Sequence, residues 1–446
     1  MSKKPNVVFI IADQWSKKHG DGSGENRDGL KTPGLDGLAQ EGMRFENSYS
    51  SFPLCCPARA SMFTGVMPHD HQITHNEEQF VEKEGAIPKR DDLATMGACF
   101  KEAGYETAYF GKEHAGGYGW DQMDTLGSFA YSGGGMLAEG SAYDSMFTKD
   151  AIEYLKQPHE QPFYMTLSLI NPHDICKVLG GKVQGATFAD AIFFCRDDNE
   201  LYLRQQPRAN VPENFTSKTL PGMIREHDYM FEEMKTMTQN DWRRYISTYN
   251  LLVEKTDWYI QLVLDTLKTQ GLADETIVVF TTDHGDMMGA HGIIAKTNFY
   301  EESANTQLIV KYPSIIQAGV VNHEAMISTI DLMPTLLDLC DINIPPTVKG
   351  KSFKEALTGD NSAHDHVFSM NYDGRMVRFE QFKYILSEMD GQVYELLFDL
   401  EQDPLESTNV AGVKGYETAA AKGSTLLKTY LAKEKLGLKF TYSWED

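Results

Sequence analysis

Short apolar runs recur along the chain and alternate with stretches whose apolar residues follow a helical spacing. Two of these stretches have clear helix boundaries. One begins at Thr32 and Pro33 and ends at Gly42, and a longer one over residues 241–270 is closed by Gly271. Apolar runs that alternate with helices are typical of a parallel sheet covered on both faces, so the pattern predicts an α/β fold. The runs that we interpret as strands are residues 7–12, 44–49, 107–110, 163–169, 276–282 and 307–311.

The pattern changes after about residue 349, where short strand-like runs follow one another and a polar, alanine-rich helix is expected near residues 415–433. A chain of 446 residues also exceeds what one hydrophobic core usually supports. We therefore expect a large α/β domain over residues 1–348 and a smaller C-terminal α+β subdomain over residues 349–446, with an antiparallel sheet and a helix. Residues 177–240 show little periodicity, and we interpret them as a long insertion near the functional site. The short C-terminal runs are residues 366–370, 375–378, 384–387 and 393–399.

The net charge limits the ligands that the chain can bind. It has 41 Lys and Arg against 64 Asp and Glu, which gives a formal charge of −23. A field of this sign repels nucleic acid and long sulfated or phosphorylated polymers. An anionic ligand must therefore be small or be met by a local basic pocket.

The N-terminus and the cysteines bear on the compartment of the protein. Only five consecutive apolar residues precede Ala12, which is too few for a signal-peptide core or a membrane span. We therefore expect a cytoplasmic protein, or a periplasmic or secreted one if a leader has been removed. The six cysteines have no C-x-x-C spacing, so they predict neither a disulfide framework nor a zinc site.

Polar side chains follow three of the predicted strands at the point where each strand ends. Asp13 and Gln14 follow the first strand, Asp283 and His284 follow the fifth, and His173 lies shortly after the fourth. Because open α/β sheets bind ligands at the carboxyl ends of their strands, the two pairs can supply ligands to one divalent cation. Their donors are mostly oxygen and suit Ca²⁺, Mg²⁺ or Mn²⁺. Either pair by itself is more typical of a loop or a helix cap.

The segment from Pro53 to Gly65 combines two cysteines with a proline and an arginine. Pro57 indicates a helix start and Gly65 its end, which would put Cys55 beside a helix N-terminus. The partial positive charge there favours an anion, and Arg59 adds a planar cationic fork that suits a tetrahedral oxyanion. On the cysteines alone, a buried structural pair before an ordinary helix would be favoured.

This segment resembles the signature of the type I sulfatase family, C-x-P-x-R with a later apolar pair, threonine and glycine, and it matches at every position. The resemblance implies the alkaline-phosphatase-like fold of that family, in which a large mixed, mostly parallel sheet is sandwiched by helices. It also implies that Cys55 is oxidised to formylglycine, whose hydrated aldehyde is the nucleophile. The other blocks that match in the family's order are residues 13–14, 111–114, 171–173, 282–285, 296–303, 375–378 and 397–404.

The resemblance further implies one divalent metal ion, held by Asp13, Gln14, Asp283 and His284 together with an oxygen of modified Cys55. Many sulfatases have aspartate in place of Gln14 and asparagine in place of His284. The glutamine and histidine versions also occur in choline sulfatases and phosphonate monoester hydrolases, which are similar in fold. An imidazole ligand favours Mn²⁺ more than an all-oxygen site does, and Mg²⁺ is a further alternative, but Ca²⁺ is the first expectation.

For catalysis, the resemblance implies charge neutralisation at the sulfate oxygens and proton transfer on both sides of the sulfur. His114 would be the base that releases the enzyme-bound sulfate, and His173 or Lys296 would protonate the departing alcohol oxygen. Outside this motif context, each basic residue would more often be a solvated charge or a structural side chain. The residues assigned to catalysis are Cys55, Arg59, Lys112, His114, His173 and Lys296, with Asn76 as a substrate-binding residue.

We therefore expect a sulfatase, a sulfuric ester hydrolase that acts on a sulfated sugar or another small organic sulfate. A phosphonate or phosphate ester hydrolase with the same nucleophile is an alternative, because Gln14 and His284 permit it. A non-catalytic protein that binds metal or sulfate, in which Cys55 stays a thiol, is an alternative of a different class. The expected partners are the small sulfated substrate and a transient formylglycine-generating maturation enzyme, without nucleic acid or membrane.

Overall fold

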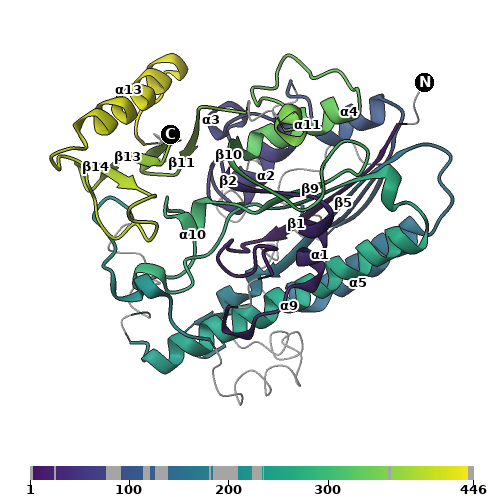
Figure 1. Cartoon of the computed structure of the whole chain (residues 1–446), viewed down its shortest axis with the longest axis horizontal. Coiled ribbons are helices and arrows are strands. Elements are labelled where there is room, and N and C mark those ends of the chain that lie inside the picture. The colour runs from purple at the N-terminus through teal and green to yellow at the C-terminus, as the bar shows by residue number, and fades with distance from the viewer. Residues whose placement is uncertain are drawn as a thin grey trace, which may run out of the picture.

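The computed structural model of the chain has two main sheets of very different size (Figure 1). The larger sheet lies between two layers of helices, and the smaller sheet lies with its helix α13 at one end of the molecule. The expected α/β fold with a C-terminal appendix is therefore confirmed. The structure describes residues 4–24, 27–76, 92–113, 121–125, 139–179, 182–183, 209–223, 234, 236–359 and 363–439.

In the described residues the larger sheet has eight strands in the order β10, β2, β9, β8, β1, β5, β3, β4. Neighbouring strands are parallel except at β9, which runs antiparallel to both β2 and β8. The sheet is thus mixed and mostly parallel, and it contains all of the strands predicted in this part of the sequence. The bounds are β1 Asn6–Asp13, β2 Met43–Tyr49, β3 Glu106–Gly111, β4 Gln122–Thr125, β5 Phe163–Pro172, β8 Thr276–Thr282, β9 Leu308–Lys311 and β10 Val320–Ser328.

Two strands of the larger sheet that the sequence did not predict, β4 and β10, lie at its edges. β4 has four residues, and β10 exposes His323 and Glu324 near its middle. The register of β10 against β2 also shifts between Asn322 and Met326. Edge strands are solvated along one side, so neither segment needs the continuous apolar run by which a central strand is predicted.

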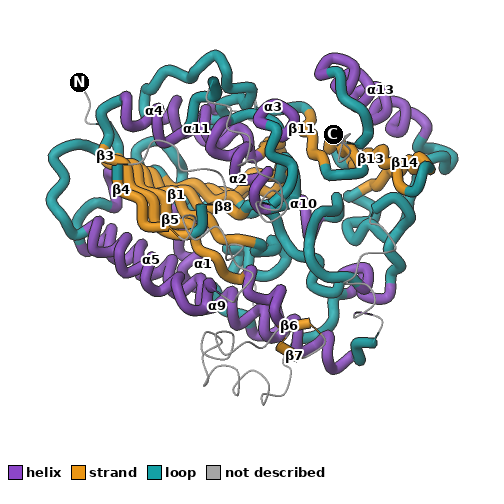
Figure 2. Tube along the Cα trace, turned by 180° about the vertical axis from the view of Figure 1, so that it is seen from behind, coloured by secondary structure: helices purple, strands orange, loops and turns teal. Residues whose placement is uncertain are grey.

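Alternate residues of the central strand β1 face opposite layers of helices. Val8 and Ile10 pack in the same core as helices α1, α5 and α9, whereas Val7 and Phe9 pack in the core of helices α2, α4 and α11. Both faces of β1 are therefore buried, as its unbroken apolar run predicts. Figure 2 shows the strands between these two layers. The bounds are α1 Pro33–Glu41, α2 Cys55–Thr64, α4 Met96–Glu102, α5 Glu139–Leu155, α9 Gln239–Thr269 and α11 Leu332–Leu339.

The smaller sheet is antiparallel in the order β11, β12, β13, β14, and helix α13 packs on β12 and β13. Its core includes Val377, Tyr384 and Leu427. The division of the chain near residue 349 stays a prediction, and Phe353 beyond it packs in the core of the larger sheet. The bounds are β11 His366–Met370, β12 Gly374–Phe379, β13 Phe382–Met389, β14 Gln392–Asp399 and α13 Glu417–Glu434.

The remaining described elements are short. The strands β6 Val178–Leu179 and β7 Lys182–Val183 pair within the predicted insertion. Most of that insertion lies outside the described residues, so its place near the site stays a prediction. Within the described ranges, no helix has both the length and the apolar composition that crossing a membrane requires. The other helices are α3 Pro68–His71, α10 Glu301–Ala304 and α12 Lys354–Leu357, with 3-10 turns at Arg27–Gly29, His173–Lys177, Glu213–Thr216, Ala273–Glu275, Ala290–Gly292 and Thr329–Asp331.

Three central strands bring the predicted polar clusters to one edge of the larger sheet. β1 pairs in parallel with β5 on one side and with β8 on the other. The register places Asp13 opposite Pro172 of β5, and Ala12 opposite Thr282 of β8. Because the three strands end together, the residues that follow β5 and β8 lie beside Asp13.

Candidate active site

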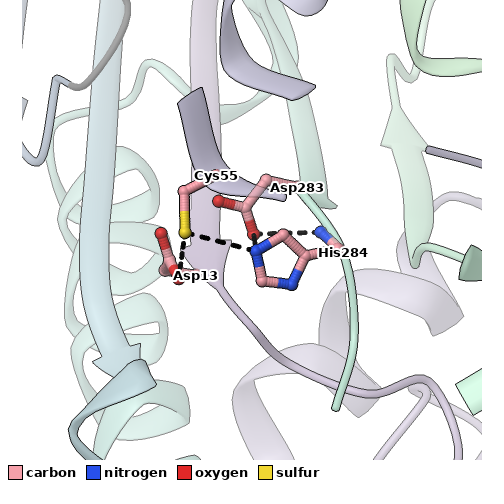
Figure 3. A group of neighbouring side chains, drawn as sticks. All are labelled: Asp13, Cys55, Asp283 and His284. Carbon is pink, nitrogen blue, oxygen red and sulfur yellow. Dashed lines mark hydrogen bonds and ion pairs between the residues drawn. The ribbon is translucent and has the colours of Figure 1, made fainter. Parts of the chain in front are cut away.

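Four side chains from three separate segments meet at this edge: Asp13, Cys55, Asp283 and His284 (Figure 3). All four are fully buried, and their potential ligand atoms lie within 4.8 Å of one another. The Sγ of Cys55 lies 3.3 Å from His284 Nε2 and 3.7 Å from Asp13 Oδ1. The structure thus brings together Asp13 from one predicted strand end, Asp283 and His284 from the other, and the predicted nucleophile.

Helix α2 places Cys55 in this group. The helix begins at Cys55 itself, two residues earlier than Pro57 indicates, because Leu54 is still extended with φ −152° and ψ 142°. It ends where Gly65 adopts the left-handed conformation with φ 66°, as predicted. Residue 55 therefore lies in the first turn of a buried helix, where backbone N–H groups give a partial positive charge.

The orientation of His284 suits a metal ligand. Its Nδ1 lies 3.0 Å from the carbonyl oxygen of Gly285, so an N–H at Nδ1 donates there and leaves the Nε2 lone pair facing Cys55. Gly285 is required at this point, because a Cβ would lie 2.0 Å from the carbonyl oxygen of Glu302. Two carboxylates and an imidazole, with the side chain of residue 55 as the fourth group, form a donor set that fits one divalent cation.

Arg59 binds both carboxylates of the group. Its Nε donates to Asp283 Oδ2 at 2.9 Å and its Nη2 donates to Asp13 Oδ2 at 3.0 Å. The Nη1 donates to Ser168 Oγ at 2.6 Å and to the carbonyl of Lys112 at 3.0 Å. Burial alone would lower the pKa of Arg59, but the charges of Asp283 and Asp13 raise it above its ordinary value. The guanidinium thus holds the two carboxylates in place, and its predicted contact with a substrate oxyanion stays a prediction.

Two lysines add positive charge, of which Lys112 is buried and Lys296 is partly exposed. Lys112 Nζ lies 2.8 Å from Asp13 Oδ2, and Lys296 Nζ lies 3.3 Å from Cys55 Sγ and also contacts Gln14 Oε1. Burial raises the pKa of Asp13, but Lys112, His173 and Arg59 reverse this and hold it well below its usual range. Burial and Asp13 likewise raise the pKa of the Cys55 thiol, yet Lys112 and Lys296 bring it below its ordinary value. The side chain at position 55 therefore lies in a site that favours negative charge.

His173, in the 3-10 turn after β5, also lies at the site. Its Nε2 is 4.0 Å from Asp13 Oδ1, and its Nδ1 has no hydrogen-bond partner among the described residues. Burial, together with Lys296 and Lys112, holds the pKa of His173 well below its usual value. The lowered pKa favours the neutral imidazole, so His173 would need the negative charge of a bound sulfate to hold the proton that it gives to a substrate.

Two other predicted residues have different outcomes. Asn76 is half-buried, and its Oδ1 accepts a hydrogen bond of 3.2 Å from the backbone N–H of Cys56, so it braces the first turn of α2. Its predicted contact with substrate stays a prediction. His114 lies outside the described residues, so its role as the catalytic base stays a prediction.

The structure also places residues at the site that the sequence analysis did not assign. Asp286 Oδ2 accepts a hydrogen bond of 2.6 Å from Gln14 Nε2, and Cys176 Sγ lies 3.4 Å from the same nitrogen. Ser168 of β5 accepts from Arg59. Asp286 could have been singled out because it follows Asp283 by three residues in one loop, whereas nothing in the sequence distinguishes Ser168 or Cys176.

A second group of ligand-type side chains, His69, Asp70 and Glu434, lies near the surface, where α3 approaches α13. Here the ammonium of Lys349 already lies 2.6 Å from Asp70 Oδ1 and 3.0 Å from Glu434 Oε2. The lysine compensates both carboxylates, so this group has less need of a metal cation than the buried group around Cys55.

Comparisons with known proteins identify the family of the chain. The family model of sulfatases matches residues 5–342, and the model named N-sulphoglucosamine sulphohydrolase, C-terminal, matches residues 289–433. Delta 4,5-hexuronate-2-O-sulfatase of Bacteroides thetaiotaomicron is 28% identical, over 97% of this chain and 90% of its own length. Choline-sulfatase of Rhizobium meliloti is also 28% identical, over 92% of this chain and 82% of its own length. The solved structure of a 2-O GAG sulfatase is 25% identical and has a TM-score of 0.81, covering 98% of this chain and 95% of that one.

Of the functions that the sequence left open, these findings favour the sulfatase. Sulfatases generally use a divalent metal ion and a formylglycine, and the buried group Asp13, Cys55, Asp283 and His284 could provide both sites. Because the sulfatase model matches most of the chain, the chain belongs to the sulfatase family and is a sulfuric ester hydrolase.

Proposed function

We propose that this chain hydrolyses a sulfate ester of a small sulfated sugar, with residue 55, matured from cysteine to formylglycine, as its nucleophile. The observation that carries the proposal is the meeting of Cys55 with Asp13, Asp283 and His284 in one buried group. Arg59, Lys112 and Lys296 surround that group. This arrangement attracts an anion to the predicted nucleophile.

Asp13, Asp283 and His284 would hold the divalent cation, with Gln14 and residue 55 as further ligands. The donors are mainly oxygen, so Ca²⁺ is our first choice, and the imidazole keeps Mn²⁺ and Mg²⁺ as alternatives. When bound, the ion would supply Lewis acidity and neutralise charge on the sulfate group.

The protein side chains divide the remaining tasks. When mature, a formylglycine at position 55 would supply the attacking oxygen. Lys296, 3.3 Å from the side chain of residue 55, and Lys112 would neutralise the sulfate oxygens as the sulfate group reacts. Arg59 fixes Asp13 and Asp283, which keeps the metal ligands in one geometry. His173 would give a proton to the departing alcohol oxygen, and His114 would accept the proton that must leave residue 55 when sulfate is released.

The charge of the chain and the names of its relatives support a small substrate. A net charge of −23 repels long polyanions, whereas a single sulfated sugar can be drawn in by the local lysines. One relative is named for a sulfated hexuronate and another for choline sulfate. We choose the sugar, because the relative named for it aligns over more of this chain.

The decisive experiment combines a mass measurement with a substrate panel. Protein coexpressed with a formylglycine-generating enzyme is digested, and the mass of the peptide that contains residue 55 is measured by mass spectrometry. We expect the peptide to have the mass of the formylglycine form and not that of the cysteine form. We also expect the protein to hydrolyse sulfated mono- and disaccharides. Cys55→Ala should abolish turnover and keep the fold. An unmodified Cys55 without turnover would support a binding protein instead. A higher kcat/KM for the phosphonate than for the sulfate ester of one phenol would support a phosphonate hydrolase.

A further inference from the structure

The side chain of Gln14 is held from both ends of its carboxamide. On one side, Nε2 donates a 2.6 Å hydrogen bond to Asp286 Oδ2. On the other side, Oε1 faces the ammonium of Lys296, which itself lies 3.3 Å from Cys55 Sγ. Gln14 and Asp286 are both fully buried, so water does not compete for the hydrogen bond between them, whereas Lys296 is partly exposed.

These contacts permit only one orientation of the amide. If the carboxamide were rotated by 180°, its oxygen would face the carboxylate of Asp286 and its NH₂ group would face the ammonium of Lys296. Both of the new contacts would be repulsive, acceptor against acceptor and donor against cation. The amide oxygen therefore points toward the positive charge beside Cys55.

Asp286 is suited to fix this orientation because both of its oxygens are engaged as acceptors. Oδ1 accepts a 2.8 Å hydrogen bond from the backbone N–H of Met288, and Oδ2 accepts the one from Gln14. An asparagine at position 286 has one acceptor oxygen, so it can satisfy Met288 or Gln14 but not both. If it kept the bond to Met288, its NH₂ group would face that of Gln14.

We infer that Asp286 is a positioning residue that turns the Gln14 amide oxygen toward the metal ion of the active site. The inference rests on the proposed function, because it assumes that the cation binds among Asp13, Asp283 and His284. Groups that orient metal ligands in this way commonly change metal affinity by about 10- to 100-fold. We place Asp286 outside the metal ligands, since it is not among the four clustered side chains.

The test is a calcium titration of the EDTA-treated full-length protein by calorimetry, with Cys55 left unmodified in every variant. Asp286→Asn should weaken binding by about 10- to 100-fold. Removal of a nearby negative charge would also weaken binding, so the same substitution is repeated in the Gln14→Ala background. If Asp286 acts through Gln14, Asp286→Asn should lower calcium affinity by no more than about twofold in the Gln14→Ala background. Twofold is about the error within which independent effects add. An equal loss in both backgrounds would overturn the inference.

Asp257→Asn is the matched control. Asp257 is also buried, and its two oxygens accept hydrogen bonds from the backbone N–H groups of Gly34 and Leu35 at 2.8 and 2.7 Å. These hydrogen bonds join helix α9 to helix α1 and do not involve Gln14, so the substitution should leave calcium affinity within about twofold of wild type. Loss of affinity in this control equal to that in Asp286→Asn would show a general effect of buried carboxylates and would also overturn the inference.

A metal-free measurement keeps the test valid if binding becomes too weak to measure. In EDTA, the charge-conserving pair Gln14→Glu with Asp286→Asn restores one acceptor facing one donor, so its Tm should exceed that of either single variant. A double variant no more stable than the less stable single one would refute the contact between the two side chains. If the wild-type protein binds no divalent cation, both the proposed metal site and the role of Asp286 are wrong. If the wild type binds calcium and Asp286→Asn binds it with the same affinity, only the positioning role is wrong.

Discussion

Lys296 Nζ lies 3.3 Å from the Sγ of Cys55, although 241 residues separate them in the sequence. Cys55 begins helix α2, and Lys296 lies in the loop that follows strand β8. The contact places the Lys296 ammonium next to Cys55, the predicted nucleophile. His173 instead approaches the group from the end of β5, at 4.0 Å from Asp13 Oδ1.

This difference in position predicts different kinetic effects for the two residues. Lys296→Ala should lower kcat for every sulfate ester, because charge at the reacting oxygens must be neutralised whatever alcohol departs. His173→Ala should lower kcat by about 100- to 10,000-fold for a sugar sulfate and much less for 4-nitrophenyl sulfate, whose leaving group needs no proton. Steady-state kinetics on both esters checks this. The reverse pattern would transfer the role of proton donor to Lys296.

The central part of this site could be predicted from the sequence for a physical reason. Strands β1 and β8 are buried on both faces, so β1 appears as an unbroken apolar run and β8 as a run of apolar residues and threonines, and the end of each is easy to find. The polar residues directly after them, Asp13 and Asp283, must then lie at one edge of a parallel sheet. Helix α2 was also predictable to within two residues, because Pro57 lies in its first turn and Gly65 ends it.

The contacts between side chains could not be predicted in the same way. Asp286 accepts a hydrogen bond from Gln14, although 272 residues separate them in the sequence. The direction of the Gln14 amide also depends on Lys296, which lies in the same loop as Asp286. Ser168 meets Arg59 only because β5 lies next to β1 in the sheet. Such contacts follow from the order and register of strands, which the apolar pattern of a single strand does not contain.

Arg59 should be important for stability as well as for the site. Arg59→Ala leaves two buried carboxylates, Asp13 and Asp283, without their shared guanidinium, and we expect it to reduce the free energy of unfolding by about 3–5 kcal/mol in EDTA. Calcium should recover part of this loss, because the ion compensates the same carboxylates. Urea unfolding with and without calcium measures both effects.

Lys268→Ala provides the control for Arg59. Lys268 pairs with Glu41 at 2.7 Å, but both side chains are nearly half exposed to solvent, so its removal should cost less than about 1 kcal/mol. An Arg59→Ala protein as stable as this control would contradict the structural role of the guanidinium.

Removal of the metal should lower the stability of the wild-type protein. A cation that binds only the folded state at 100 times its Kd adds about 2.7 kcal/mol to the free energy of unfolding, so EDTA should lower Tm and excess calcium should restore it. Asp283→Asn removes one buried ligand charge and should abolish most of this response. The control is Asp338→Asn, since that partly exposed carboxylate pairs with Lys354, away from the four clustered side chains. An equal calcium shift in both variants would place the ion elsewhere.

The ion pair of His364 with Asp331 should make the stability of the fold depend on pH. His364 Nε2 lies 3.0 Å from Asp331 Oδ2. Burial lowers the pKa of His364, but the hydrogen bond and the charge of Asp331 outweigh it and raise the pKa above its ordinary value. The folded state therefore holds this proton more tightly than the unfolded state does. The contribution to stability is complete below the unfolded-state pKa of about 6.5 and is lost as the pH rises through the folded-state pKa.

His364→Gln should remove this pH dependence while keeping an N–H group that can donate to Asp331. We expect the wild type to exceed the variant in free energy of unfolding at about pH 5.5, with a smaller difference at about pH 8.5, because only the protonated imidazole gains from the aspartate charge. Urea unfolding of both proteins at the two pH values measures the change. A difference that is constant with pH would mean that the contact acts as a neutral hydrogen bond.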